Sequence, residues 1–277
     1  MAAITAAAVK ELRQVTGLPM MDCKKALTEC DGEQEAAISW LRERGAKVMD
    51  KRADRETAFG RFGLCIGVDK TASAMVELKC ESDPVAKNEE FIQLATDLAA
   101  ALASCSSDVT TDELLALASP SKEGVTLGEQ RDELMNRIRE VFNIGRMTRS
   151  EGGSGGYSHN AGTISGVMIS VTGGNDAVAK DVCMHVAAMR PASLTVDELD
   201  KDVVEKERGI LREAAIKEGK PENIVDKMVE GRMRNYYAER VLLEQPFVKE
   251  PKMTVGQFAK DNGMAVSQFV HWELGSE

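Results

Sequence analysis

Covalent chemistry needs reactive side chains at workable spacing, and this chain offers few. Its histidines are His159, His185 and His271. Cys183 stands two residues before His185, a separation that turns the two side chains toward different faces of a helix and disfavours a nucleophile–base pair. His185 is flanked by apolar residues, which favours a hydrogen-bonded histidine in the core. We therefore expect no catalytic residue and no enzyme activity.

The cysteines do not indicate a metal or redox centre. They form no CxxC pair, and no histidine follows them at metal-ligand spacing. We interpret them as buried thiols of a protein in a reducing compartment, and we predict neither a metal nor a cofactor. The six are Cys23, Cys30, Cys65, Cys80, Cys105 and Cys183.

The strongest functional candidate is the acidic turn, by which we mean residues 81–88 (Glu-Ser-Asp-Pro-Val-Ala-Lys-Asn). A strand-like run, residues 74–79, leads into it. Two compatible interpretations of Asp83 stay open. Asp83 followed by Pro84 has the pattern of a helix N-cap with proline in the first turn. Alternatively, the turn displays the Asp83 carboxylate toward another protein.

The pattern of strand, turn and helix start returns later in the chain. Residues 167–172 lead into 173–180 (Gly-Gly-Asn-Asp-Ala-Val-Ala-Lys), and Asp83 corresponds to Asp176 at a constant offset (176 − 83 = 93). A gap-free match over such a length is typical of a duplicated supersecondary unit. Only the turns differ in character, so we infer that the first turn acquired a function of its own.

Composition limits the kinds of partner. A length of 277 residues suggests about two domains. The net charge of −10 disfavours unaided binding to a nucleic-acid backbone, which needs clustered Lys and Arg. No apolar run approaches the roughly 18 residues of a membrane span, and the N-terminal sequence lacks a secretion signal. We expect a cytoplasmic protein that binds neither nucleic acid nor membrane directly.

The first 52 or so residues predict three short helices in a compact bundle of the ubiquitin-associated (UBA) type. Thr5 is expected to cap the first helix, which ends at Gly17. Asp31 is expected to cap the third helix, which ends at Gly45, with a charged helical linker over residues 47–55.

Two methionines in the expected second helix, Met20 and Met21, are adjacent. Neighbouring residues cannot share one face of a helix, so at most one belongs to the core. The other is an adaptable apolar contact for a partner.

The middle of the chain predicts a sheet covered by helices. Residues 64–68 and 74–79 alternate as a β-hairpin with one buried face, and Glu77 is expected on the opposite face. The glycine-rich residues 152–156 lack the Lys-Ser/Thr of a phosphate-binding loop and are expected as a flexible linker or hairpin tip. Between the β-hairpin and the glycine-rich segment, an amphipathic helix is expected. Its apolar stripe is Phe91, Leu94, Leu98 and Leu102.

Two amphipathic helices separated by residues 219–221 (Gly-Lys-Pro) predict an antiparallel helical hairpin. The tail is expected to return to the second sheet as a helix and a strand. The expected stripe of the first helix is Val203, Ile210, Leu211 and Ala214. The expected stripe of the second is Ile224, Val225, Met228, Val229, Met233 and Tyr236.

Four segments, in order along nearly the whole chain, resemble elongation factor Ts, a family of nucleotide-exchange factors. The acidic turn is similar to the family's Thr-Asp-Phe-Val-Ala-Lys-Asn segment, with Pro84 in place of the phenylalanine. The segments are 12–17 with 20–27, 82–88, 184–188, and 227–233 with 245–248.

The resemblance implies a partner, elongation factor Tu, in its GDP-bound and nucleotide-free states. It implies that the N-terminal helices dock on the GTPase domain of Tu. It also implies that the acidic turn disturbs the Mg²⁺ and phosphate site, so that GDP leaves and GTP can bind. The implied docking residues are Leu12, Met20, Met21 and Lys24. The implied Mg²⁺-dislocating residues are Ser82, Asp83, Pro84 and Val85.

Three details of the resemblance concern this chain in particular. Pro84 is smaller than the family's phenylalanine wedge, so Asp83 and the rigid turn are expected to carry more of the disruption. His159 corresponds to a family histidine close to Tu, with a capped hairpin tip as the alternative. Some relatives continue into a further C-terminal helix, whose contact with Tu is expected to be missing here.

Taken together, the sequence predicts an α+β fold with a UBA-like three-helix domain and linker (1–56). Two related antiparallel-sheet-plus-helix subdomains (57–151, and 152–194 with 246–277) and a protruding helical hairpin (195–245) complete it. The function expected is guanine-nucleotide exchange in translation elongation. The alternative is a scaffold that docks through the UBA-like domain and the hairpin without promoting exchange.

Overall fold

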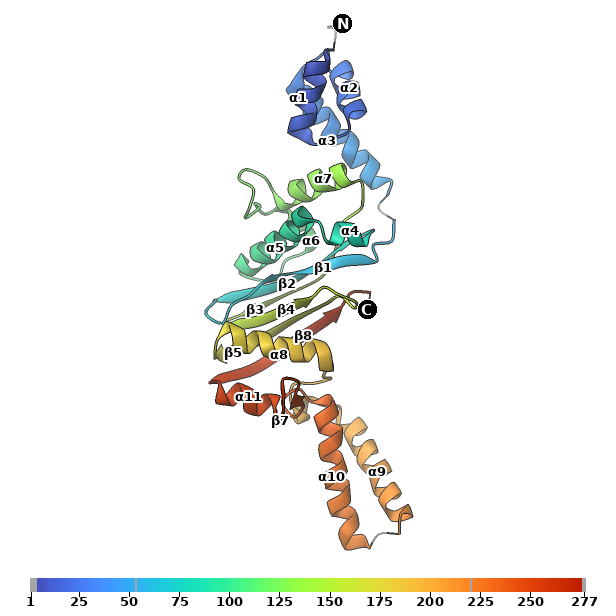
Figure 1. The fold of residues 1–277 in the computed structure, drawn as a ribbon, viewed down its shortest axis with the longest axis vertical. Coiled ribbons are helices and arrows are strands. Elements are labelled where there is room, and N and C mark those ends of the chain that lie inside the picture. Colours follow the sequence, from blue (N-terminus) through green and yellow to red (C-terminus); the bar gives the residue numbers. More distant parts are fainter. Residues whose placement is uncertain (1–3, 53, 220, 276–277) are drawn as a thin grey trace. The chain divides into compact units, whose positions relative to one another are not determined.

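The computed structural model describes residues 4–52, 54–219 and 221–275. The chain divides into two compact units, which we describe separately. Unit 1 comprises residues up to 65, 74–149 and from 274 onward; unit 2 comprises 66–73 and 150–273. The fold is mixed α/β, with helices at the N-terminus and antiparallel sheets (Figure 1).

Unit 1 begins with three helices, α1 (Ala6–Thr16), α2 (Met20–Glu29) and α3 (Gln34–Asp50). The predicted ends of α1 are confirmed. The Thr5 hydroxyl accepts a hydrogen bond from the Ala8 N–H at 3.2 Å, and Gly17 closes the helix in the left-handed region at φ 67°. The three helices share a small apolar core of Val9, Leu12, Leu18, Cys23, Ala26, Leu27, Ala37 and Leu41.

Both predicted boundaries of α3 are wrong. Asp31 lies in a left-handed turn at φ 51°, and the helix starts only at Gln34. Gly45 does not end the helix; it is buried inside it, and a Cβ there would lie 1.8 Å from the Asn136 side chain of α7 (Leu127–Ile138). Gly45 leaves room for the Asn136 side chain, a contact between helices that local sequence does not reveal.

The sheet of unit 1 has the strand order β1-β2-β3, formed by β1 (Phe59–Cys65), β2 (Ala72–Cys80) and β3 (Asn143–Glu151). The expectation of one buried face is wrong, because Glu77 on the opposite face is also buried. The Arg146 guanidinium donates to both Glu77 oxygens, from Nε at 3.0 Å and from Nη2 at 2.9 Å. Ion pairing thus makes the buried carboxylate tolerable.

Helices α4 (Asp83–Ala86), α5 (Glu89–Ser104) and α6 (Thr111–Ala116) complete unit 1 together with α7. The predicted apolar stripe of α5 is confirmed, since all four of its residues are buried.

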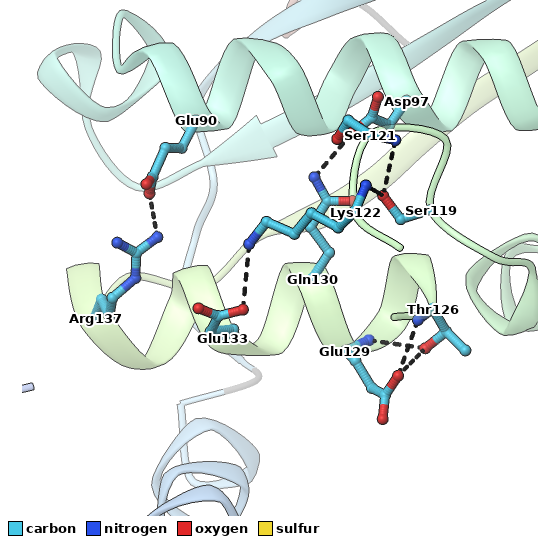
Figure 2. A network of polar contacts seen from close by, with 10 residues as sticks. All are labelled: Glu90, Asp97, Ser119, Ser121, Lys122, Thr126, Glu129, Gln130, Glu133 and Arg137. Atoms are coloured by element: carbon cyan, nitrogen blue, oxygen red, sulfur yellow. Dashed lines mark hydrogen bonds and ion pairs between the residues drawn. The ribbon is translucent and has the colours of Figure 1, made fainter. Parts of the chain in front are cut away.

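A polar network joins α7 to α5 (Figure 2). The buried Asp97 carboxylate accepts hydrogen bonds from Gln93 at 2.9 Å, Ser121 at 2.5 Å and Gln130 at 2.9 Å. Arg137 of α7 also pairs with Glu90 of α5. Because buried polar groups need partners, these contacts fix where α7 lies.

Unit 2 contains a second antiparallel sheet, with the order β4-β5-β8, formed by β4 (Ser154–His159), β5 (Ser165–Gly173) and β8 (Met264–Glu273). The glycine-rich segment is a turn only at Gly152, which has φ 83°. Residues 154–156 form the buried start of β4, so the prediction of a flexible linker or hairpin tip is wrong for these three residues. A Cβ on Gly155 would lie 2.4 Å from Ala179, so glycine allows α8 (Asp176–Met189) to approach the strand.

The rest of unit 2 consists of short elements and two long helices. The short elements are a 3₁₀ turn (Val196–Glu198), β6 (Pro246–Phe247), β7 (Glu250–Thr254) and α11 (Val255–Asp261). The predicted return of the tail as a helix and a strand is confirmed by α11 and β8. In the part of the chain that is described, no helix combines the length and the apolar character needed to cross a membrane.

The two long helices, α9 (Lys201–Lys217) and α10 (Glu222–Arg240), pack side by side (Figure 1). Arg212 and Asp226 form an ion pair across them at 2.6 Å. The predicted stripe of α9 is partly wrong, because Val203 and Ile210 are exposed. The contact face keeps Leu211 of the predicted stripe, and Val204 and Ala215 contribute to it in place of Val203 and Ala214.

Candidate partner-binding site

The repeated pattern recurs in the secondary structure of the two copies. Strands β2 and β5 occupy equivalent ranges at the offset of 93 residues, and Asp83 and Asp176 are the first residues of α4 and α8. The helix of the first copy is interrupted, because α4 ends at Ala86 and Asn88 caps α5 anew. The first copy therefore carries a one-turn helix that the second lacks.

The N-cap interpretation of Asp83 is wrong by one residue. Ser82 holds the N-cap position with an extended backbone (φ −140°, ψ 151°), and Asp83 and Pro84 form the first turn. The Ser82 hydroxyl does not cap α4; it donates to Glu140 Oε1 at 2.6 Å. The Asp83 carboxylate is consequently free of a capping role.

Asp83 is accessible to a partner. Its side chain is 49% exposed, and Oδ2 accepts a hydrogen bond from Lys87 Nζ at 2.6 Å. An exposed i,i+4 ion pair contributes only about 0.5 kcal/mol, so a partner can displace it at small cost. Pro84 beside it is also exposed. The Val85 side chain is buried in the core of unit 1.

The backbone of the acidic turn is held on both sides. Glu81 accepts hydrogen bonds from the Val141 N–H at 2.8 Å and from Arg55 at 3.0 Å. On the other side, Arg61 Nε donates to the Ala86 carbonyl at 3.1 Å. The turn is thus a rigid support for Asp83 rather than a loose loop.

Cys80 precedes the turn and is chemically quiet. Burial raises the pKa of its thiol to about 12, and the carboxylates of Glu140, Asp83 and Glu81 add to the rise. Its Sγ lies 3.3 Å from the Ser82 carbonyl, to which it donates. A protonated thiol is a poor nucleophile, so Cys80 serves packing.

The expected docking residues of the N-terminal helices fall into two groups. We call Met20, Met21 and Lys24 the α2 surface: all three are exposed, with Met20 at 52% and Met21 at 73%. This agrees with the expectation that at most one methionine is core. Leu12 is fully buried among the three helices, so it cannot touch a partner and instead supports α2 from beneath.

The histidines lie in unlike environments. His159 ends β4, where its Nδ1 lies 3.0 Å from the Tyr157 hydroxyl, so it belongs to a strand end. His185 is a core histidine, as expected. Its Nδ1 accepts from the Val248 N–H at 3.1 Å, which leaves the proton on Nε2 to donate to Gln245 at 2.9 Å. Burial lowers the pKa of His185.

Cys183 is buried, and burial raises the pKa of its thiol, so the neighbouring pair with His185 offers no activated nucleophile. Within the described ranges, no group of three or more His, Cys, Asp or Glu side chains is placed to hold a metal ion.

Sequence reasoning missed Arg139 and Glu140, which directly follow α7. Arg139 pairs with Asp22 of α2, and Glu140 accepts the Ser82 hydroxyl of the acidic turn. Their partners lie 117 and 58 residues away, so no local pattern could have indicated these contacts.

Comparison with known proteins supplies the class. A family model described as Elongation factor TS matches residues 81–276. The chain is 42% identical over 275 residues to elongation factor Ts of Hydrogenovibrio crunogenus, covering 99% of this chain and 92% of that protein. The Methylococcus capsulatus protein of the same name is 42% identical, at 98% and 92% coverage. The Ruegeria pomeroyi protein is 40% identical, at 99% and 93% coverage.

These matches place the chain in the class of translation elongation factors. It belongs to the elongation factor Ts family.

Proposed function

We propose that this protein is the guanine-nucleotide exchange factor of elongation factor Tu. It binds Tu·GDP in the cytoplasm and promotes GDP release without covalent chemistry or a cofactor of its own. The observation that carries the proposal is the accessible Asp83 carboxylate, held on an anchored one-turn helix.

The physical basis is electrostatic and mechanical. A GTPase holds GDP through its phosphates, with a phosphate-binding loop and Mg²⁺. A carboxylate brought next to this site competes for the metal and repels the phosphates. Every loss of about 1.4 kcal/mol from the bound state can speed GDP release tenfold. Because coupling is reciprocal, GDP weakens binding of the exchange factor as much as the factor weakens binding of GDP.

We further propose how the parts share the work. Helices α1–α3, with the linker to residue 56, form a UBA-like domain that docks on the GTPase domain of Tu through the α2 surface. Residues 57–151 form the first core subdomain, and 152–194 with 246–277 form the second, where His159 is a peripheral contact. Residues 195–245 form the coiled-coil hairpin of α9 and α10.

The test measures release of fluorescent GDP from purified Tu with and without this protein. We expect acceleration by the parent protein and a loss of about tenfold for Asp83→Asn, which keeps the shape and removes the charge. Asp176→Asn, at the equivalent position of the second copy, is the matched control and should stay within twofold of the parent. Binding to Tu without acceleration would favour a scaffold instead.

A further inference from the structure

Two consecutive residues at the end of α7 contact both elements assigned to partner binding. The Arg139 guanidinium pairs with Asp22, which lies on α2 between Met21 and Lys24. The next side chain, Glu140, accepts a hydrogen bond from Ser82, the residue before Asp83. One short segment therefore connects the α2 surface to the acidic turn.

We propose that Arg139 and Glu140 are positioning residues that hold the α2 surface and the acidic turn at one fixed separation. A partner then engages both surfaces together. This inference rests on the proposed exchange function, because it assigns the two surfaces to the same partner.

The backbone of Arg139 supports a dedicated role. It occupies the left-handed region (φ 67°, ψ 25°) and closes α7 through a hydrogen bond from its N–H to the Met135 carbonyl at 2.7 Å. Glycine is favoured at such a position, and any other residue there is strained. The Arg139 carbonyl also accepts from Arg52 Nη1, just beyond α3, at 2.8 Å. An arginine is thus kept where glycine fits better, and both its side chain and its carbonyl contact the N-terminal helices.

Glu140 and its neighbour hold the acidic turn from the other direction. Glu140 Oε1 accepts the Ser82 hydroxyl at 2.6 Å, and the Val141 N–H donates to Glu81 at 2.8 Å. These two contacts fix the residues directly before Asp83. A change at Glu140 should therefore alter the direction in which the Asp83 carboxylate points.

The segment can transmit position only if α7 itself is fixed. The network in Figure 2 provides this, because Gln130 and Arg137 of α7 bind Asp97 and Glu90 of α5. Gly45 of α3 also packs against Asn136 of α7. The three-helix domain and the acidic turn are consequently both held by α7 and the two residues that follow it.

A fixed separation has a defined advantage. Once the α2 surface has bound, the acidic turn meets its target at the effective concentration set by the connection, and a rigid connection of the right length maximises it. Breaking the Arg139–Asp22 contact or the Glu140–Ser82 contact lowers this effective concentration. Neither change removes a residue that is proposed to touch the partner.

Arg139→Gly tests the first contact, because it relieves the strained backbone while deleting the ion pair. We expect a melting temperature no lower than that of the parent, and an affinity for Tu·GDP weaker by about fivefold or more. The maximal GDP release rate at saturating protein should stay within twofold. The charge swap Asp22→Arg with Arg139→Asp should restore the affinity to within twofold. Arg212→Ala, which breaks a comparable exposed ion pair between α9 and α10, is the control and should bind as the parent does.

Glu140 tests the second contact through a different readout. Glu140→Ala should lower the maximal GDP release rate by about tenfold while changing the affinity less. Glu140→Gln, whose amide oxygen can still accept the Ser82 hydroxyl, should recover most of the rate. Failure of this recovery, or of the charge swap, would overturn the inference.

The outcomes separate the inference from the function on which it rests. If the parent protein does not accelerate GDP release, the proposed function is wrong. If the parent accelerates release and both Arg139→Gly and Glu140→Ala match it in affinity and rate, the function stands and the positioning role is wrong.

Discussion

Asp83 and Asp176 start helices at equivalent positions of the two repeats, yet their carboxylates are used differently. Asp176 Oδ1 accepts a hydrogen bond from the Val68 N–H at 2.9 Å, so it serves the structure of its own unit. Asp83 pairs with the exposed Lys87 side chain, four residues further along the chain. Of the two equivalent aspartates, Asp176 makes a structural hydrogen bond, whereas Asp83 presents an exposed charge.

By the resemblance to elongation factor Ts, Pro84 takes the place of a phenylalanine in the acidic turn. It is exposed in the first turn of α4, so a larger side chain fits there without repacking the core. We expect Pro84→Phe to speed GDP release from Tu by about threefold to tenfold, because an aromatic side chain adds buried area at the interface. Stopped-flow release of labelled GDP measures it. A rate within twofold of the parent would show that a wedge does not matter in this protein.

Asp97 should be important for stability although it is far from the acidic turn in sequence. Asp97→Ala removes the acceptor of Gln93, Ser121 and Gln130, and of these three donors only Gln130 is buried. We expect a loss of about 2 kcal/mol in the free energy of unfolding, measured by urea titration. Asp132→Ala, on the exposed side of α7, is the control and should change stability by less than about 0.5 kcal/mol.

Gly155 and Gly209 form a second matched pair. Alanine at Gly155 would place its Cβ 2.4 Å from Ala179, so Gly155→Ala should destabilise unit 2 by about 2 kcal/mol. Gly209 lies inside α9 with no atom within 4 Å of the added Cβ. Gly209→Ala should therefore stabilise by about 0.5–1 kcal/mol through helix propensity. Thermal denaturation of both variants checks the opposite signs, and equal signs would contradict the packing described for β4 and α8.

His185 should make stability depend on pH. Burial lowers its pKa, so the native state keeps the imidazole neutral while the unfolded chain takes up a proton near pH 6.5. The contribution of neutral His185 to the free energy of unfolding is complete above pH 6.5. It is lost as the pH falls below that value. The slope for one such group is at most about 1.4 kcal/mol per pH unit. His271, whose pKa burial also lowers, acts in the same direction.

Urea titrations at pH 7.5, 6.5 and 5.5 measure this dependence. His185→Gln cannot take up a proton and should give a flatter profile than the parent. A profile as steep as the parent's would assign the dependence to other groups.

Local rules predicted the elements that local chemistry controls. The Thr5 cap, the Gly17 stop and the stripe of α5 follow from residue type and spacing alone, and they are confirmed. The repeat can also be recognised in the sequence, because both copies have the same strand pattern and the same helix start. Display of the Asp83 carboxylate is one of two interpretations that the sequence leaves open, and no sequence rule separates Asp83 and the α2 surface from Leu12 and Val85, which are buried.

The errors concern positions where distant parts of the chain meet. The sequence predicts a helix stop at Gly45 and a flexible linker or hairpin tip around Gly155, whereas Gly45 leaves room for the Asn136 side chain and Gly155 lets α8 approach β4. Strand alternation predicts Glu77 on the solvent-facing side of the hairpin. Its ion-pair partner, Arg146, is 69 residues away, so the local sequence does not indicate that Glu77 is buried. In each case the residue type suits a contact with a distant part of the chain. The neighbouring sequence does not indicate that contact.

The Asn88 cap has a consequence for how this family can diversify. Asn88 accepts hydrogen bonds from the Glu90 and Phe91 N–H groups, so α5 starts on its own signal whatever the preceding turn contains. Residues 83 and 84 can thus vary between lineages, or in a designed library, while the scaffold beneath stays folded. An exchange factor built in this way can follow changes in its GTPase by altering a few surface positions.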